Sequence, residues 1–150
     1  MPENPDLSEL TASVHALIPV FGTMQLEVIE AAPGRAAARI PAAPNGNHFG
    51  VTYAGCLFSV AEMLGGVIGG TSFDLPGAIP LVKRVEIDFL RPASSDTTAR
   101  TELSFDEIAR VQAETLANGK SNFELVAEVV DEAGVVVART RGDYQMRVMG

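Results

Sequence analysis

Cysteine is nearly absent from this sequence, since Cys56 is the only one. No disulfide can therefore form within the chain, and nothing in it points to an oxidising compartment. The two histidines, His15 and His48, stand far from each other and from Cys56, so the spacing typical of a metal site is also missing. We expect a protein without a bound metal or cofactor.

Basic residues are also scarce, because 11 Lys and Arg stand against 19 Asp and Glu and give a formal net charge of −8. Proteins that bind nucleic acid normally carry a basic face, so we exclude that class of partner. The glycine-rich run GGVIGG at 65–70 follows no predicted strand, and it is therefore not a phosphate-binding loop.

The chain begins with the acidic, polar run MPENPDLSEL, whereas a signal peptide has a basic start followed by an apolar run. The apolar stretch 54–73 is about as long as a membrane-spanning helix. It nevertheless contains Glu62 and five glycines, and Asp74 follows it directly. We expect a cytoplasmic protein that does not enter a membrane.

Its 150 residues, 47% of them hydrophobic, suit one domain over 1–150 with a single core. Apolar residues that recur every three or four positions predict an amphipathic helix over 6–18, which Pro19 ends. We expect the segment 1–19 to pack on the domain as a helical segment. Alternating apolar and polar residues on both sides of Pro33-Gly34 predict a β-hairpin.

Most of the remaining chain is typical of antiparallel strands around one buried helix. The segment 54–68 is apolar on nearly every face, as a helix surrounded by protein is. The other predicted elements are strands at 81–93, 97–105, 121–131 and 135–148, and a helical or irregular excursion at 106–120. The expected fold is α+β, with a five- to six-stranded antiparallel sheet wrapped around a long central helix. The outer face and edges of that unit would favour pairing with a second copy.

One carboxylate interrupts the apolar helix, because Glu62 is the only charged side chain between Tyr53 and Phe73. Burial of an unpaired carboxylate costs free energy, and such a group shifts its pKa or finds a partner. Glu62 is therefore either a structural ion-pairing or surface residue, or a catalytic carboxylate with a pKa raised toward neutrality.

The order of elements resembles the hotdog fold, and more narrowly the acyl-CoA thioesterases of the phenylacetate-degradation type. The signature of that family is an Asn, then His-Gly-Gly, then Leu-Phe-Ser-Leu-Ala followed by Asp or Glu on the central helix. The matching residues here are Asn47, then Tyr53-Ala54-Gly55, then LFSVAE at 57–62, with FLRPA at 89–93 closing a strand.

The resemblance implies a thioesterase that acts on an acyl-CoA or another acyl thioester, as a homodimer or a dimer of dimers. The N–H groups of Ala54 and Gly55 at the helix start would form the oxyanion hole, and Glu62 would be the base or the nucleophile. Asn47 would position the attacking water or the thioester, from the opposite subunit to Glu62. Asn45 in the same turn is the alternative to Asn47.

The candidate substrate-binding residues are Tyr53, His48, Phe58 and Gly66. Tyr53 stands in place of the histidine of the family, and Ala54 in place of its first glycine. Gly65-Gly66 stands where many relatives carry a Ser or Thr that holds the water, a task for which Thr52, Ser59 or His48 are candidates.

Four glycines at 65, 66, 69 and 70 indicate either close packing of helix on sheet or room for an acyl chain. Coenzyme A phosphates would need cations, for which the candidates are Lys83, Arg84, Arg91, Arg110 and Lys120. The alternative function is that of a non-catalytic acyl-CoA-binding hotdog protein. A hotdog dehydratase, which would rely on His48, is a further alternative.

Overall fold

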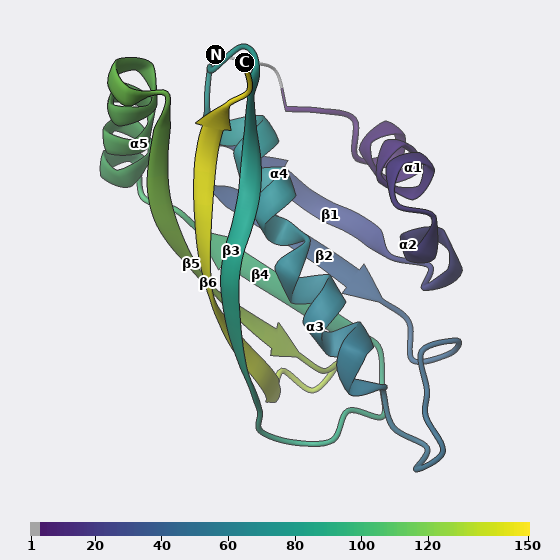
Figure 1. The fold of residues 1–150 in the computed structure, drawn as a ribbon. Helices are drawn as coiled ribbons and strands as arrows, with labels where there is room; N and C mark the ends of the chain where they lie inside the picture. Colours follow the sequence, from purple (N-terminus) through teal and green to yellow (C-terminus); the bar gives the residue numbers. More distant parts are fainter. Residues whose placement is uncertain (1–3) are drawn as a thin grey trace.

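The computed structural model describes residues 4–150, so the first three residues of the predicted N-terminal segment lie outside the described part. Within that part the chain forms five helices and six strands (Figure 1). The helices are α1 (Leu7–Leu17), α2 (Pro19–Thr23), α3 (Ala54–Glu62), α4 (Leu64–Ser72) and α5 (Phe105–Asn118). The strands are β1 (Glu27–Ala32), β2 (Arg35–Ile40), β3 (Ala78–Phe89), β4 (Thr97–Glu102), β5 (Lys120–Val130) and β6 (Val136–Val148).

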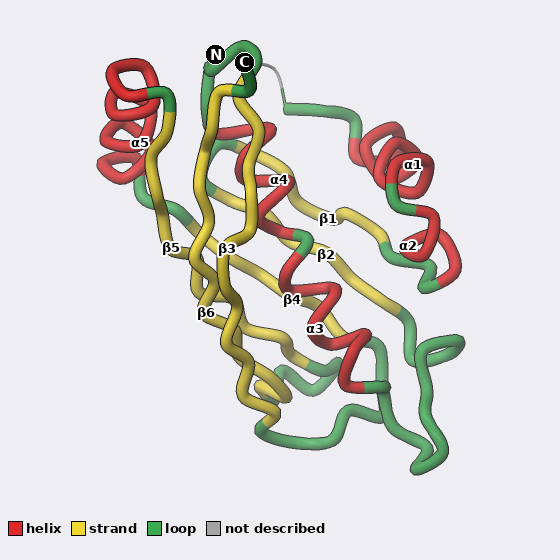
Figure 2. The backbone as a smooth tube through the Cα atoms, viewed as in Figure 1, coloured by secondary structure: helices red, strands yellow, loops and turns green. Residues whose placement is uncertain are grey.

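The six strands form one sheet in the order β1-β2-β4-β5-β6-β3, with every neighbouring pair antiparallel. Figure 2 shows this sheet curving around the central helix α3–α4. Along β5, buried and exposed residues alternate from Ser121 to Val129, as expected for a strand with one face on the core. The predicted α+β fold, a sheet wrapped around a long helix, is confirmed.

Turn chemistry explains how the strands are joined. The β1–β2 hairpin turns at Pro33-Gly34, where Gly34 has a φ of +76° and a Cβ would lie 2.5 Å from the carbonyl oxygen of Leu103. The predicted excursion at 106–120 is the helix α5, which begins at the N-cap Ser104 and ends at Gly119 with a φ of +78°.

The predicted central helix differs from expectation in two ways. It extends to Ser72, and it is interrupted at Met63, where α3 ends and α4 begins. It is also not surrounded by protein on every side, since Ala54, Gly66 and Gly70 are exposed. The whole span Ala54–Ser72 is long and apolar enough to cross a membrane, but half of its most apolar window is buried in the fold, as in the core helix of a soluble protein.

The N-terminal helices cover one edge of the sheet. Asp6 caps α1 by accepting a hydrogen bond from the Glu9 N–H at 2.9 Å. Pro19 ends α1 but also begins α2, because proline fits the first position of a helix. Two side chains of α1 bind the first sheet edge: Thr11 accepts from the Val28 N–H at 3.0 Å, and His15 donates to the Leu26 carbonyl at 2.6 Å.

Candidate active site

The start of α3 presents backbone donors without partners. Tyr53 is the N-cap residue, and its carbonyl oxygen accepts from the N–H groups of Cys56 at 2.9 Å and Leu57 at 3.2 Å. Within residues 4–150, the N–H groups of Ala54 and Gly55 donate to no acceptor. Free N–H groups at a helix N-terminus carry partial positive charge, so they can bind a developing oxyanion.

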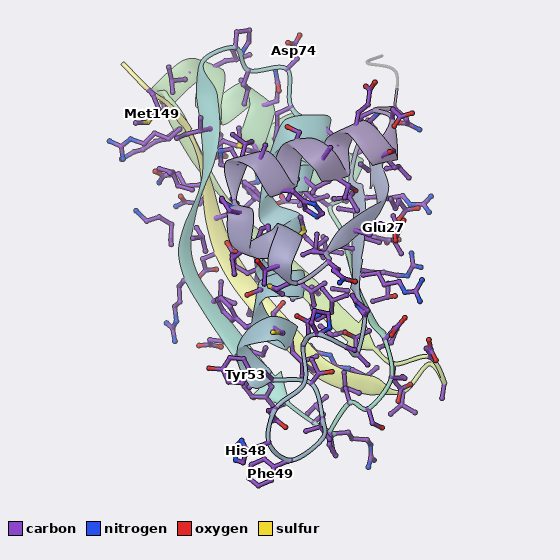
Figure 3. The ribbon with its side chains drawn as sticks, turned by 90° about the vertical axis from the view of Figure 1, so that its right-hand side faces the viewer. Glu27, His48, Phe49, Tyr53, Asp74 and Met149 are labelled. Carbon is purple, nitrogen blue, oxygen red and sulfur yellow. The ribbon has the colours of Figure 1, made fainter. Side chains whose placement is uncertain are left out.

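The Tyr53 side chain lies against this helix start. A Cβ on Gly55 would lie only 2.6 Å from Cε1 of Tyr53, so the tyrosine ring rests on the glycine. The Tyr53 side chain is also 58% exposed, which leaves it able to contact a ligand. His48 and Phe49 lie at the same end of the molecule as Tyr53 (Figure 3). The ring centroids of His48 and Phe49 are 3.9 Å apart.

Asn45 and Asn47 have different roles in the loop before α3. Asn45 is buried, and its amide donates to the carbonyl oxygens of Met24 and Pro41, both at 2.9 Å. Asn47 is half-buried, and its Oδ1 accepts from the N–H groups of Phe49 at 2.9 Å and Val51 at 3.3 Å. The Asn47 amide N–H groups meet no acceptor among the described residues, so they are available to a ligand, whereas those of Asn45 are not.

Glu62 lies half-buried in the wall of a cavity of about 500 Å³. Burial raises the pKa of its carboxyl, because the charged form is poorly solvated there. No group within the part of the chain that the structure describes donates a hydrogen bond to this carboxylate. The ion-pair interpretation of Glu62 therefore fails within one copy of the chain.

The cavity lies between the N-terminal helices, the central helix and β3. Its lining is almost entirely apolar, and the residues that line it are Leu10, Ser13, Val14, Leu17, Ile18, Phe21, Glu62, Met63, Gly65, Gly66, Val67, Pro80, Leu81, Val82 and Tyr144. Glu62 and Gly66 thus share one wall. No pattern in the sequence indicated the cavity or the place of Tyr144 in it, since the apolar stripe of α1 also suits direct packing on the core.

The helical glycines divide between the two interpretations offered for them. A Cβ on Gly65 would lie 2.0 Å from the Tyr144 ring, and one on Gly69 would lie 2.5 Å from Pro80, so these two allow close packing. A Cβ on Gly66 or Gly70 would meet nothing within 4 Å. Gly65 and Gly69 thus lie on a closely packed face of the helix, and Gly66 and Gly70 lie on an open face.

The proposed oxyanion donors and Glu62 do not meet within one chain. Gly55 and Glu62 are seven residues apart, which places them on the same helix face but about 10 Å apart along the axis. Phe58, half-buried, lies between them. A glutamate side chain spans only part of that distance, even when it leans toward the helix N-terminus.

The candidates for holding a water molecule are mostly occupied. The Ser59 hydroxyl donates to the carbonyl oxygen of Gly55 at 2.8 Å, and Thr52 is buried. Cys56 packs against the core, and burial raises the pKa of its thiol, which suits an apolar role. His48 is exposed beside Asn47 and is the remaining candidate.

No three His, Cys, Asp or Glu side chains gather in a metal-binding cluster among residues 4–150. Of the candidate cations, Arg84 is paired with Glu86, and Arg110 with Glu107 and Glu114. Lys83, Arg91 and Lys120 form no ion pair within the described residues, so these three of the five candidates are free for a phosphate group.

The sheet wrapped around a helix, with a carboxylate on that helix, defines a hotdog-fold protein of the thioesterase superfamily, as the resemblance implied. The chain belongs to the family described as Domain of unknown function (DUF4442), whose model matches residues 8–148. No functionally curated protein matches the chain.

Three crystal structures illustrate the similarity. A Pseudomonas aeruginosa protein of unknown function, described as a probable thioesterase, is 34% identical with a TM-score of 0.88, over 99% of this chain and 100% of that one. A Chlorobaculum tepidum protein of unknown function is 18% identical with a TM-score of 0.82, over 97% and 98%. A thioesterase from Haemophilus influenzae is 16% identical with a TM-score of 0.76, over 99% and 95%, and shares the fold.

Proposed function

We propose that this protein hydrolyses an acyl thioester, with an acyl-CoA as the substrate class, at a site shared between two copies of the chain. The names of the similar structures support a thioesterase-type function. The observation that carries the proposal is Glu62, a half-buried carboxylate without a hydrogen-bond donor in an apolar cavity, on the same helix whose first N–H groups are unpartnered.

Thioester hydrolysis needs a polarised carbonyl and an activated nucleophile. The Ala54 and Gly55 N–H groups bind the carbonyl oxygen as it becomes negative. Glu62 removes a proton from a water molecule, whose oxygen bonds to the carbonyl carbon while the carbon–sulfur bond breaks. The thiolate takes up that proton, and the products are a carboxylic acid and a thiol. Direct attack by the Glu62 carboxylate, with later hydrolysis of the anhydride, uses the same groups.

Two copies are required because Glu62 and the N–H groups of its own helix are about 10 Å apart along the axis. The edge strand β3 offers the surface for pairing, since no strand of the described chain pairs with its outer edge. Its side chains Val82 and Phe89 are 49% and 52% exposed. Pairing through β3 would bring the helix start of one copy toward Glu62 of the other, in a homodimer or a dimer of dimers.

The residues around the helix start fit this chemistry. The free Asn47 amide donates to the thioester carbonyl or orients the water, while its Oδ1 holds the loop. We assign Tyr53, His48 and Phe58 to contacts with the rest of the substrate, since Tyr53 and His48 are exposed near the helix start and Phe58 is half-buried between Gly55 and Glu62 in the helix. We place the reaction in the cytoplasm, where acyl-CoA substrates are found.

Thiol release from a panel of acyl-CoAs tests the proposal, with the wild type compared with Glu62→Gln. Turnover that survives unchanged in Glu62→Gln would overturn the role of Glu62. A mixture of Glu62→Gln with Asn47→Asp tests the shared site, because a mixed dimer contains one site with both residues intact. Re-equilibrated equal mixtures should recover about a quarter of wild-type activity in a symmetric dimer. No recovery, or a monomer by light scattering, would contradict a shared site.

The second candidate function is non-catalytic acyl-CoA binding. Gly66 favours it, because it leaves open space where many relatives hold a water molecule with Ser or Thr. Tight binding of acyl-CoA without thiol release from any member of the panel would establish this function instead.

A further inference from the structure

The cavity beside Glu62 continues well beyond the carboxylate. Its far wall consists of Leu10, Val14 and Leu17, which lie on one face of α1, together with Phe21 of α2. None of the α1 residues is buried, although this face is apolar. Leu10 and Val14 pack on the core only in part and Leu17 is 79% exposed, so this apolar stripe borders the cavity instead of being covered by the core.

The N-terminal helices are held at the sheet edge, and they form a roof over the central helix. Thr11 and His15 bind α1 to the backbone near the start of β1, as described above. Figure 3 shows α1 and α2 crossing in front of the central helix. The space beneath them is lined by apolar side chains, and Glu62 is the one charged residue among those that line it.

Gly66 joins the carboxylate to this space. It lies one turn beyond Glu62 on the same face, and a Cβ added there would meet nothing within 4 Å. A larger side chain at this position would stand in the passage between Glu62 and the roof. Gly65 has a different role, because the Tyr144 ring already fills the space beside it.

We propose that this cavity binds the unbranched aliphatic acyl chain of the substrate, with the thioester at Glu62 and the tail beneath α1 and α2. The inference rests on the proposed function and adds the substrate class to it. A methylene group fills about the volume of a water molecule, on the order of 30 Å³. A cavity of about 500 Å³ therefore accepts a chain of medium to long length, whereas an acetyl group would leave most of it unfilled.

Apolar contact also predicts how binding depends on chain length. Each methylene removed from water should tighten binding by about fourfold until the cavity is full. A small aromatic acyl group would lack this dependence. The aliphatic side chains of the cavity can contact a flexible acyl chain along its whole length; they include Leu10, Val14, Leu17 and Val67.

Binding of neutral alcohols tests the cavity separately from catalysis, since an alcohol contains no thioester and no charge to repel Glu62. Calorimetry with hexanol, octanol, decanol and dodecanol should show affinity rising with each pair of carbons in the wild type. Gly66→Leu should weaken decanol binding by about tenfold or more. Gly70→Leu is the matched control, because Gly70 is equally open but does not line the cavity, and it should bind as the wild type does.

Acyl-CoA turnover is then measured as a function of chain length. The proposal expects kcat/KM to rise from acetyl-CoA to dodecanoyl-CoA, and this rise to be lost in Gly66→Leu but kept in Gly70→Leu. Alcohol binding that is independent of length, or equal in both variants, would overturn the acyl-chain cavity even if thioesters are hydrolysed. Length-dependent binding without any turnover would support the cavity and count against the proposed function alone.

Discussion

The Tyr144 hydroxyl donates a hydrogen bond to the backbone carbonyl oxygen of Glu62 at 3.0 Å, and so connects β6 to the central helix. The interruption of that helix lies at the same place. The Gly66 N–H donates to the carbonyl oxygen of Met63, three residues back instead of four. Tyr144 thus supplies the Glu62 carbonyl with a donor at the point where the regular helical pattern stops.

Tyr144→Phe should lower both stability and activity. Loss of the hydroxyl leaves the Glu62 carbonyl without its donor, at a cost of about 1 kcal/mol. In a protein of this size that corresponds to a fall in Tm of about 2–4 °C, measured by thermal denaturation. Because the bond fixes the backbone of Glu62, kcat should fall with KM nearly unchanged. An unchanged Tm and kcat would show that the bond has no such role.

Gly65→Ala and Gly66→Ala should have opposite effects on stability. At Gly65 the new methyl group would overlap the buried Tyr144 ring, and overpacking of that kind costs about 1–3 kcal/mol. At Gly66 the methyl group meets nothing, so the better helix propensity of alanine should add about 0.5–1 kcal/mol. Urea denaturation of the two variants measures the difference. A change in the free energy of unfolding with the same sign in both variants would contradict the assignment of Gly65 to close packing and Gly66 to open space.

Glu62→Gln should make the protein more stable than the wild type at neutral pH. Burial raises the pKa of Glu62 in the folded state above its ordinary value of 4.5, so folding favours the protonated form. The stability that this contributes is complete below about pH 4.5 and is lost as the pH rises through the raised pKa. The Tm of the variant minus that of the wild type should therefore increase with pH across this range. A difference that stays constant with pH would exclude the shift.

The activity of the wild type should depend on the same group in the opposite direction. A general base or nucleophile must be ionised, so kcat/KM should rise with pH through the raised pKa of Glu62. The midpoint of that rise should lie above the ordinary glutamate value of 4.5. The pH profile of thiol release measures it, and a midpoint at or below the ordinary value would assign the titration to a different group.

Ala54→Pro removes one oxyanion donor while the helix is retained. Ala54 is the first residue of α3, and Tyr53 before it has a φ of −60° and a ψ of 136°, which a following proline allows. The Tm should therefore change little. If the Ala54 N–H binds the oxyanion, kcat should fall by about 10²–10³-fold. Full activity in a folded variant would leave the Gly55 N–H as the sole donor.

Asn47→Asp and Asn45→Asp should separate a functional from a structural asparagine. The Asn47→Asp variant keeps an oxygen for the Phe49 and Val51 N–H groups, so its Tm should stay near that of the wild type while activity is lost. The Asn45→Asp variant loses both donors to buried carbonyl groups and should unfold at a lower temperature. Circular dichroism and thiol release, measured on both variants, check this contrast. The converse pattern would assign the role to Asn45.

The strands and the start of the central helix follow from local patterns in the sequence. Alternation fixes the inward face of β5, and the small residues after Tyr53 place the helix N-terminus correctly. Glu62 stood out because a lone carboxylate in an apolar helix needs a physical reason. The sequence does not indicate that Glu62 lacks a hydrogen-bond donor or that the Asn47 amide is free. Both depend on how segments distant in sequence are arranged around these side chains.

Other features depend on contacts between distant segments. The interruption at Met63 involves Tyr144, which lies 82 residues from Glu62 in sequence, and no pattern around residue 63 indicates it. Which glycines face a neighbour depends on Tyr144 and Pro80, both outside the helix. Pro19 is compatible with the end of one helix and the start of another, and local sequence does not choose between them.

The attachment of α1 to β1 also limits how copies of this chain can assemble. A sheet with two bare edges can add neighbours on both sides and grow without end, as fibrils do. Here Thr11 holds the Val28 N–H at the β1 edge, so a strand that paired there would have to displace α1, whereas no strand or helix is bonded to the outer edge of β3 among the described residues. A sheet with a valency of one can form a closed pair but not a chain of sheets. The contact of α1 with β1 thus favours a closed pair formed through β3 over an open array of sheets.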